Sequence, residues 1–295
     1  MKNNSFKEKI EEVKKFQEQS LINGKVLTIT SGKGGVGKST SAANIATGLA
    51  KLGKKVVVTD FDIGLRNLDM ILGLENRVIY DNIDVMDGRC NLAQALIKSK
   101  KNENLYFLPA SQTADKTALK IQKVKNLIND LKSKFDYVII DSPAGIEEGF
   151  EHSVVLADEI LIVVNPEISS IKDADKVIGI VDAKCEKSKL GIDIPKYLII
   201  TRIKQELVNQ GKMLSIDNIL EILSIPLIGI VPEDDNVIGS TNIGIPVIEN
   251  SHKLISGKAY ENISRRILGE TVDFIALEES NKFKTFIKSF FSKGK

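Results

Sequence analysis

The stretch VLTITSGKGGVGKST, residues 26–40, joins an apolar run to a glycine-rich loop that ends in a Lys-Ser-Thr triplet. The run VLTIT is typical of a buried β-strand, and SAANIATGLAKLG, residues 41–53, is typical of a helix closed by a glycine. Gly32 through Ser39 fit the pattern G-x-x-x-x-G-K-[ST] between a strand and a helix, the context that this pattern requires. The glycines allow backbone N–H groups to close around phosphate oxygens. The sequence therefore predicts a phosphate-binding loop.

The residue types of this loop predict how it would hold a nucleotide. The Lys38 ammonium is expected to reach the β- and γ-phosphates, and the Ser39 hydroxyl is expected to ligate Mg²⁺. The helix that follows points its positive end at the same anion. We therefore expect ATP and Mg²⁺ as cofactors. The expected nucleotide contacts in the loop are Gly32, Lys33, Gly34, Gly35, Val36, Gly37, Lys38, Ser39 and Thr40.

Length and composition set the broad class of the protein. The chain has 295 residues, of which 42% are hydrophobic and 27% charged, which is an ordinary globular balance. The net charge of +2 gives no broad basic field for nucleic acid. Cys90 and Cys185 lie far apart without metal-ligand spacing, which predicts free thiols in a reducing compartment. No apolar run approaches the ~20 residues of a membrane span, and the acidic residues near the N-terminus argue against a transit peptide.

Short apolar runs alternate with helical patterns after Lys25, which predicts a doubly wound α/β domain with a mostly parallel sheet and helices on both faces. We expect this domain over residues 25–270, preceded by a helical extension over residues 1–24 and followed by a linker and tail over residues 271–295. The predicted strands are residues 26–30, 55–60, 105–109, 135–141, 159–165, 197–201 and 227–232.

Three carboxylates follow two of these strands. Asp60 and Asp62 come at the end of the second strand, and Asp141 ends the run FDYVIID. Ligands of doubly wound sheets bind beyond the carboxyl ends of the strands, so these acids are expected beside the loop, where they suit Mg²⁺ contacts and water positioning. No strong general base or covalent nucleophile is evident, and His152 and His252 are expected to be surface or packing residues. The chemistry predicted is phosphoryl transfer to water, at a slow rate.

A second lysine in the loop, Lys33, is not needed to bind phosphates within one subunit. The segment KGGVGKST resembles the deviant phosphate-loop ATPases of the MinD/ParA family, in which the early lysine reaches the partner's phosphates in an ATP-bound dimer. The resemblance implies that Lys33 and Lys38 act in catalysis, that Asp62 orients the attacking water, and that Ser39, Asp60 and Asp141 serve the metal. It also implies that Arg202, Pro232 and Glu233 flank the adenine.

The resemblance extends over nearly all of residues 25–270. The segments DFDIGLRNLDMILGLENRVIYDNIDVM, ENLYFLPASQTADKTAL, DSPAGIEEG and GIVPEDDNVIGSTNIGIPVI are similar to the division-site members of the family. The resemblance implies a homodimer in the ATP-bound state, a MinC-like division inhibitor and a MinE-like activator as partners, and a role in positioning the septum. Residues 1–24 are an addition that the family does not explain.

The chain ends in NKFKTFIKSFFSKGK, residues 281–295. Five apolar residues fall on one face of a predicted helix, with lysines beside them. This helix is too short to span a bilayer but suits the interface of an anionic membrane, and two such tails on one dimer would bind with avidity. The residues expected to contact the membrane are Lys282, Phe283, Phe286, Ile287, Phe290 and Phe291.

The leading hypothesis is thus an ATP-dependent membrane switch that positions the division septum. Its expected place is the cytoplasm and the inner face of the cell membrane, or the stroma and envelope of a plastid. Two alternatives stay open: a ParA-like partition ATPase that binds DNA without sequence specificity, and a flagellar-number (FlhG-type) ATPase. The near-neutral charge and the aromatic tail argue against the partition ATPase. A metabolic kinase is a more distant possibility, since no acceptor-substrate motif is evident.

Overall fold

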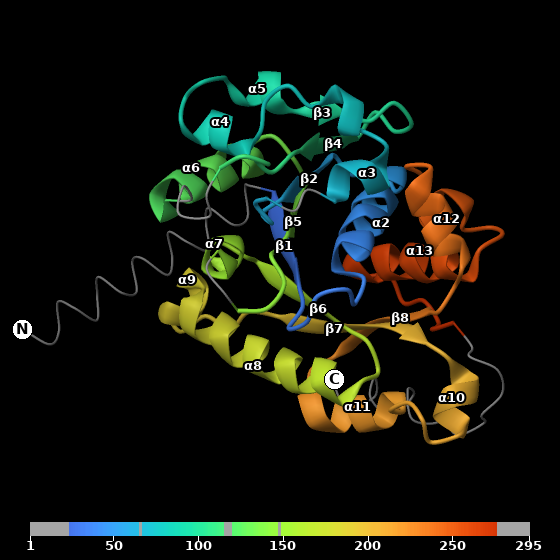
Figure 1. Ribbon diagram of the computed structural model, residues 1–295. Helices are drawn as coiled ribbons and strands as arrows, with labels where there is room; N and C mark the ends of the chain where they lie inside the picture. Colours follow the sequence, from blue (N-terminus) through green and yellow to red (C-terminus); the bar gives the residue numbers. More distant parts are fainter. Residues whose placement is uncertain (1–23, 65–66, 115–119, 147–148, 276–295) are drawn as a thin grey trace, which may run out of the picture.

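The computed structural model describes residues 24–64, 67–114, 120–146 and 149–275, which form an eight-stranded sheet between two layers of helices (Figure 1). The strand order is β3-β4-β2-β5-β1-β6-β7-β8, and every pairing is parallel except the antiparallel β3–β4 pair. The strands are β1 (Lys25–Thr30), β2 (Val56–Asp60), β3 (Ile97–Lys98), β4 (Leu105–Leu108), β5 (Tyr137–Asp141), β6 (Glu159–Val164), β7 (Lys196–Ile203) and β8 (Leu227–Pro232).

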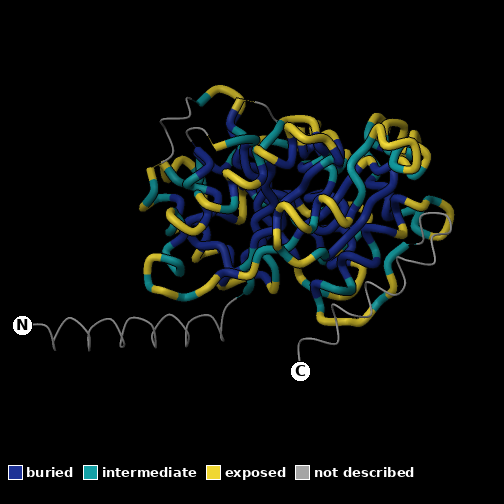
Figure 2. Tube along the Cα trace, turned by 90° about the horizontal axis from the view of Figure 1, so that it is seen from below, coloured by how far each residue is buried: buried dark blue, intermediate teal, exposed yellow. Residues whose placement is uncertain are grey.

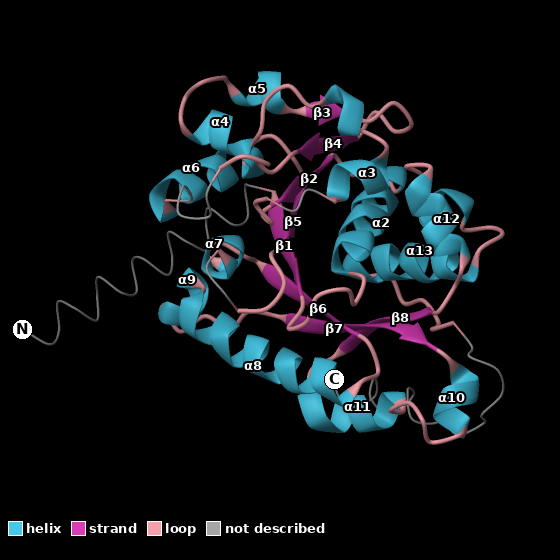
Figure 3. Ribbon diagram, in the orientation of Figure 1, coloured by secondary structure: helices cyan, strands magenta, loops and turns pink. Residues whose placement is uncertain are grey.

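Helices cover both faces of this sheet (Figure 3). α2, α3, α12 and α13 lie on one side, while α6, α7, α8 and α11 lie on the other. The helices are α2 (Lys38–Lys51), α3 (Leu68–Leu72), α4 (Asn82–Met86), α5 (Leu92–Ala95), α6 (Ile121–Lys132), α7 (Phe150–Val154), α8 (Ile168–Lys184), α9 (Glu186–Lys189), α10 (Gln205–Asn209), α11 (Ile216–Leu223), α12 (Asn236–Asn242) and α13 (Ile255–Ile267), with 3₁₀ turns η1 (Glu75–Arg77) and η3 (Val247–Asn250).

The central strands are buried on both faces, which explains why their sequences are continuous apolar runs. Side chains that alternate along β1 enter different cores: Leu27 and Ile29 pack toward α2 and α13, and Val26 packs toward α6. Figure 2 shows the result as a buried interior enclosed by exposed loops and helix faces. The glycine predicted to close α2 is Gly53, which has a φ of +83° and donates its N–H to Ala50 O.

All seven predicted strands are confirmed, and so is the mostly parallel, doubly wound sheet. The sequence did not indicate β3, because it has only two residues and one of them is exposed. Cys90 and Cys185 are free thiols, as predicted. Residues 1–23 and 276–295 lie outside the described residues, so the predicted N-terminal helix and the amphipathic tail stay predictions. No helix within the described ranges has the length and apolar character needed to cross a membrane.

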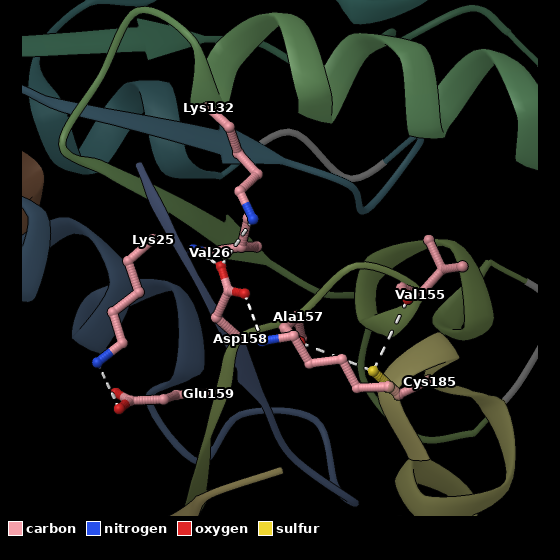
Figure 4. Close-up of polar contacts among 9 residues, drawn as sticks. Lys25, Val26, Lys132, Val155, Ala157, Asp158, Glu159 and Cys185 are labelled. Atoms are coloured by element: carbon pink, nitrogen blue, oxygen red, sulfur yellow. Dashed lines mark hydrogen bonds and ion pairs between the residues drawn. The ribbon is translucent and has the colours of Figure 1, made fainter. Parts of the chain in front are cut away.

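The amino ends of β1 and β6 are held by a buried ion cluster around Asp158 (Figure 4). Asp158 Oδ2 accepts from the Val26 N–H at 2.7 Å and from Lys132 Nζ at 3.1 Å, and its Oδ1 accepts from Lys187 Nζ at 2.6 Å. Close by, Gly24 donates its N–H to Lys132 O at 2.8 Å. The chain therefore enters the domain through a tightly bonded corner that joins β1, β6, α6 and α9.

Candidate nucleotide-binding site

The glycine-rich loop connects β1 to α2, and its conformation depends on two of its glycines. Gly35 and Gly37 have φ values of +77° and +94°, a region that strains residues with a side chain. Gly32 is required for another reason, since a Cβ there would lie 2.3 Å from the backbone carbon of Asp173 in α8. A Cβ at Gly34 or Gly35 would meet no atom within 4 Å, so one side of the loop is open.

The loop is fastened to the neighbouring strand ends. Thr201, near the end of β7, donates its hydroxyl to Val36 O at 2.6 Å and lies near Gly37. Gly145, in the loop after β5, donates its N–H to Ser31 O at 2.9 Å. These bonds join the loop to residues more than a hundred positions away in the chain, and they hold it in a fixed shape in front of α2.

Lys38 and Asp141 form a buried ion pair directly behind the loop. Lys38 Nζ lies 2.8 Å from Asp141 Oδ1, and the two side chains are only 7% and 1% exposed. Asp60 ends β2 and pairs in register with Asp141 at the end of β5, so the two carboxylates are neighbours on the sheet edge. The predicted grouping of these acids beside the loop is thus what the strand order produces.

Burial and like charge act together on Asp60. Its pKa is raised well above the ordinary value, first because the carboxyl is buried and then because Asp141 is close, while the Asp62 N–H and Lys38 act in the opposite direction. Burial alone would lower the pKa of Lys38, but the Asp141 carboxylate, with Asp60 and Asp62, outweighs it and the pKa is raised. The site therefore holds more acid than its one buried lysine neutralises, which suits the arrival of another cation.

The arrangement of donors fits Mg²⁺ together with a nucleotide phosphate. Asp141 Oδ2 is buried and has no hydrogen-bond partner among the residues that the structure describes. Carboxylate and hydroxyl oxygens are the ligands that Mg²⁺ prefers, usually with several waters retained. Ser39 and Thr40 begin α2 beside Lys38 and are half-buried. Asp62 is also half-buried, and its N–H donates to Asp60 Oδ1 at 2.8 Å.

Lys33 is placed differently from Lys38. Its Nζ lies 2.8 Å from Glu167 Oε2 and 3.1 Å from Ser169 Oγ, and the ion pair is exposed at 41% for Lys33 and 52% for Glu167. The bond to Lys33 lowers the pKa of Glu167. In the single chain, the early lysine of the loop is thus held at the start of α8.

The residues expected around the adenine come together at the carboxyl ends of β7 and β8. Arg202 is exposed and has a φ of +56°, at a register shift between the two strands. Pro232 is buried, and Glu233 donates its N–H to Ile203 O at 3.1 Å. Thr201, the residue before Arg202, contacts the glycine-rich loop. The structure therefore brings this group next to the phosphate loop, and its contact with adenine stays a prediction.

Sequence reasoning missed several residues that shape the site. No motif in the sequence marked Thr201 or Glu167 as part of the site. Asn82 donates its side-chain N–H to Asp60 O at 3.0 Å, from a segment that carried the family resemblance but in which no site residue was expected. A polar residue inside an apolar run, as at Thr201, is the one signal that could have marked a position for attention. The expected membrane residues, from Lys282 to Phe291, lie outside the described residues.

Comparison with known proteins decides the family. A family model described as an AAA domain matches residues 24–194. The septum site-determining protein MinD of Helicobacter pylori is 58% identical over 267 residues, which cover 90% of this chain and 99% of that protein. The chain belongs to the MinD family. This confirms the predicted family and fold, and it favours the division-site interpretation over the partition and flagellar-number alternatives.

Solved structures of the family agree with this assignment. The MinC:MinD cell division protein complex of Aquifex aeolicus matches with a TM-score of 0.75 and 45% identity, over 86% of this chain and 99% of that one. The septum site-determining protein MinD of Pyrococcus horikoshii, solved as a complex with Mg-ADP, matches with a TM-score of 0.73 and 28% identity, over 83% of this chain and 96% of that one. The predicted enzyme class, a phosphate-loop ATPase, is that of the MinD family.

Proposed function

We propose that this protein is an ATP-hydrolysing switch that dimerises with ATP, binds an anionic membrane and recruits a division inhibitor to position the septum. The observation that carries the proposal is the buried Lys38–Asp141 pair beside Asp60, placed directly behind an open glycine loop. A structural ion pair would satisfy both carboxylate oxygens. Among the described residues this one leaves Asp141 Oδ2 unpaired, and it gathers more carboxyl groups than lysines where the Mg²⁺ of a metal–nucleotide complex would bring positive charge.

The chain's own residues supply positioning and charge. Lys38 places its ammonium group between the Asp141 carboxylate and the β- and γ-phosphates. The N–H groups of the loop hold the phosphate oxygens. Ser39, Asp141 and Asp60 would hold Mg²⁺, which when bound neutralises charge on the phosphates. Asp62, next to this group, orients the attacking water. Arg202, Pro232 and Glu233 flank the adenine. With no strong base in this set, hydrolysis is slow until a partner stimulates it.

Lys33 supplies the link between ATP and dimerisation. Its ion pair with Glu167 is exposed, so the lysine can leave it at small energetic cost. In an ATP-bound dimer, Lys33 reaches the phosphates of the other subunit and stabilises the charge that develops there during hydrolysis. Dimer formation then requires the γ-phosphate, and the dimer dissociates after hydrolysis.

The partners follow from the family and from the C-terminal sequence. The Aquifex aeolicus relative was solved in a complex with MinC, and this chain is proposed to recruit a MinC-like division inhibitor. A MinE-like activator would stimulate hydrolysis. Residues 281–295 would fold as an amphipathic helix on an anionic membrane, where each lysine contributes about 1 kcal/mol of binding. A single tail binds weakly, so two tails on one dimer are needed for stable attachment.

Sedimentation with phosphatidylglycerol-containing vesicles tests this proposal. The full chain should co-sediment in ATP and remain mostly in the supernatant in ADP, where only the weak binding of a single tail is left. Lys33→Ala and deletion of residues 281–295 should each abolish ATP-dependent sedimentation, and only the deletion should also remove residual binding in ADP. Sedimentation that does not depend on the nucleotide, or that survives both changes, contradicts the proposed switch. Binding of DNA in a gel-shift assay, without binding of vesicles, would favour the partition ATPase.

A further inference from the structure

The short segment after α13 runs beside the edge strand β8 and is fastened there by one arginine. Arg266, in the last turn of α13, donates its Nη1 N–H to Ile228 O in β8 at 2.9 Å. Its Nε and Nη2 both donate to Val272 O, at 3.1 and 2.9 Å. Its guanidinium also lies 3.9 Å from the ring centre of Phe274. Arg266 therefore bridges the sheet edge and the segment, through contacts to three residues that a lysine could not reproduce together.

The segment also covers the edge of the sheet with apolar side chains. Phe274 packs against the core on the α8 and α11 side, while Ile275 packs against the core on the α2 and α13 side. Consecutive residues that point to opposite faces are the pattern of an extended strand. Asn262 in α13 adds a bond from its side-chain N–H to Asp273 O at 3.3 Å. We call Val272–Ile275, held in this way, the edge strap.

The helix that carries Arg266 is itself fixed to both sides of the nucleotide site. Ser256, in the first turn of α13, donates its hydroxyl to Asp234 at 2.6 Å, just after the residues expected around the adenine. Tyr260 lies 3.1 Å, oxygen to oxygen, from the Ser41 hydroxyl in α2, the helix of the phosphate loop. The strap is thus held in a constant position relative to the loop.

We propose that Arg266 is a positioning residue that fixes, through the edge strap, the point at which the membrane-binding tail leaves the domain. This inference rests on the proposed membrane function. With the strap in place, the link to the tail at Lys282 spans residues 276–281. Without it, the link begins after Leu268 and is about twice as long. The local concentration of a tethered group falls roughly as the −3/2 power of link length, so the second tail of a dimer would engage the membrane about threefold less effectively.

Vesicle titration in ATP with the full chain tests the inference. Arg266→Gln and Phe274→Ala should each bind phosphatidylglycerol-containing vesicles about threefold more weakly than the control Arg265→Gln. That control removes the same charge from the neighbouring residue, whose ion pair with Glu270 is exposed. ATP hydrolysis without vesicles should be unchanged in all three. Phe274→Ala keeps the test valid if Arg266→Gln unfolds.

Two further experiments distinguish loss of the strap from a general loss of structure and from failure of the proposed ATP-dependent switch. Deleting residues 276–280 from Phe274→Ala should restore vesicle affinity, because it shortens the link again; a merely damaged domain would not be rescued. In a Lys33→Ala background, the strap variants and the control should bind equally, since one tail alone does not depend on its exit point. Equal affinity of the strap variants and Arg265→Gln in ATP overturns the strap. If Lys33→Ala itself binds as wild type does, the proposed function fails instead.

Discussion

Two buried carboxylates mark opposite ends of the same part of the sheet, and their surroundings differ. Asp158 precedes β6 and is bonded by two lysines and the Val26 N–H at the amino end of β1. Asp141 ends β5 beside the carboxyl end of β1, with one lysine on one oxygen and no partner for the other among the described residues. Both oxygens of Asp158 are thus paired, whereas among the described residues only one oxygen of Asp141 is.

The difference shows in how each cluster titrates. Burial alone would raise the pKa of Asp158, but Lys132, Lys187 and the Val26 N–H outweigh it, and the pKa is lowered. At the other end, burial and the neighbouring Asp141 raise the pKa of Asp60. A buried carboxylate whose charge is fully paired stabilises the native fold. Buried acids that lie close together destabilise the native fold until a cation binds to them. We therefore expect the amino end of the sheet to contribute stability and the carboxyl end to bind the metal and the nucleotide.

The largest effect is expected from Asp158→Ala. This change leaves the buried Lys132 ammonium without the carboxylate that it contacts, and breaking a buried ion pair in this way costs about 3–5 kcal/mol of unfolding free energy. Urea unfolding at neutral pH would measure the loss. ATP hydrolysis by the folded fraction should stay at the wild-type rate, and a hydrolysis defect at full folding would place Asp158 in the functional cluster.

Asp141→Asn should lower ATP hydrolysis strongly and change stability little. Loss of one preorganised charge contact to the phosphate and metal site lowers hydrolysis by about 10²–10³-fold. The unfolding free energy should change by less than about 1 kcal/mol, because removal of Asp141 relieves Asp60, which can then pair with Lys38. A steady-state phosphate-release assay checks the rate. If the stability falls as far as in Asp158→Ala, the two clusters are equivalent and the comparison is wrong.

Asp60→Asn should increase stability by about 0.5–2 kcal/mol at neutral pH, as expected where a site carries functional strain. The folded pKa of Asp60 is raised, so its protonated form stabilises the fold at low pH, and this contribution is lost as the pH rises from about 4 through the folded pKa. The advantage of the Asn variant should therefore grow with pH over that window. Asp158, with a lowered pKa, contributes with the opposite sign: its stabilisation is present above about pH 4 and is lost as the pH falls below it. Thermal unfolding at a series of pH values would show both trends, and an Asn variant whose advantage shrinks with pH would contradict the first.

The smallest effect on stability is expected from Lys33→Ala. The ion pair with Glu167 is exposed, and such pairs contribute less than about 1 kcal/mol. The unfolding free energy should therefore be nearly that of the wild type, while ATP-dependent dimerisation, followed by light scattering, is lost. The matched control Lys176→Ala removes another exposed pair of α8, with Asp173, and should leave both stability and dimerisation intact.

The functional end of the sheet could be predicted from the sequence better than the structural end. Continuous apolar runs identify the central strands, and acids at their carboxyl ends must then lie beside the loop, which is why Asp60 and Asp141 were found together. The Asp158 cluster joins Lys132, Lys187 and Asp158 from three separate elements, and each looks like an ordinary solvated residue in the sequence. The bonds of Thr201 to Val36 and of Lys33 to Glu167 span 165 and 134 positions, and only the folded chain brings them together.

The stabilisation that Mg-ADP gives to each variant tests the comparison most directly. A ligand that binds only the folded state raises the unfolding free energy by an amount set by its concentration and affinity. We expect Mg-ADP to raise the melting temperatures of the wild type and of Asp158→Ala by the same increment, although Asp158→Ala starts from a lower melting temperature. In Asp141→Asn the part of the increment that requires Mg²⁺ should disappear. A full Mg²⁺-dependent increment in Asp141→Asn, or its loss in Asp158→Ala, would contradict the assignment of the two ends.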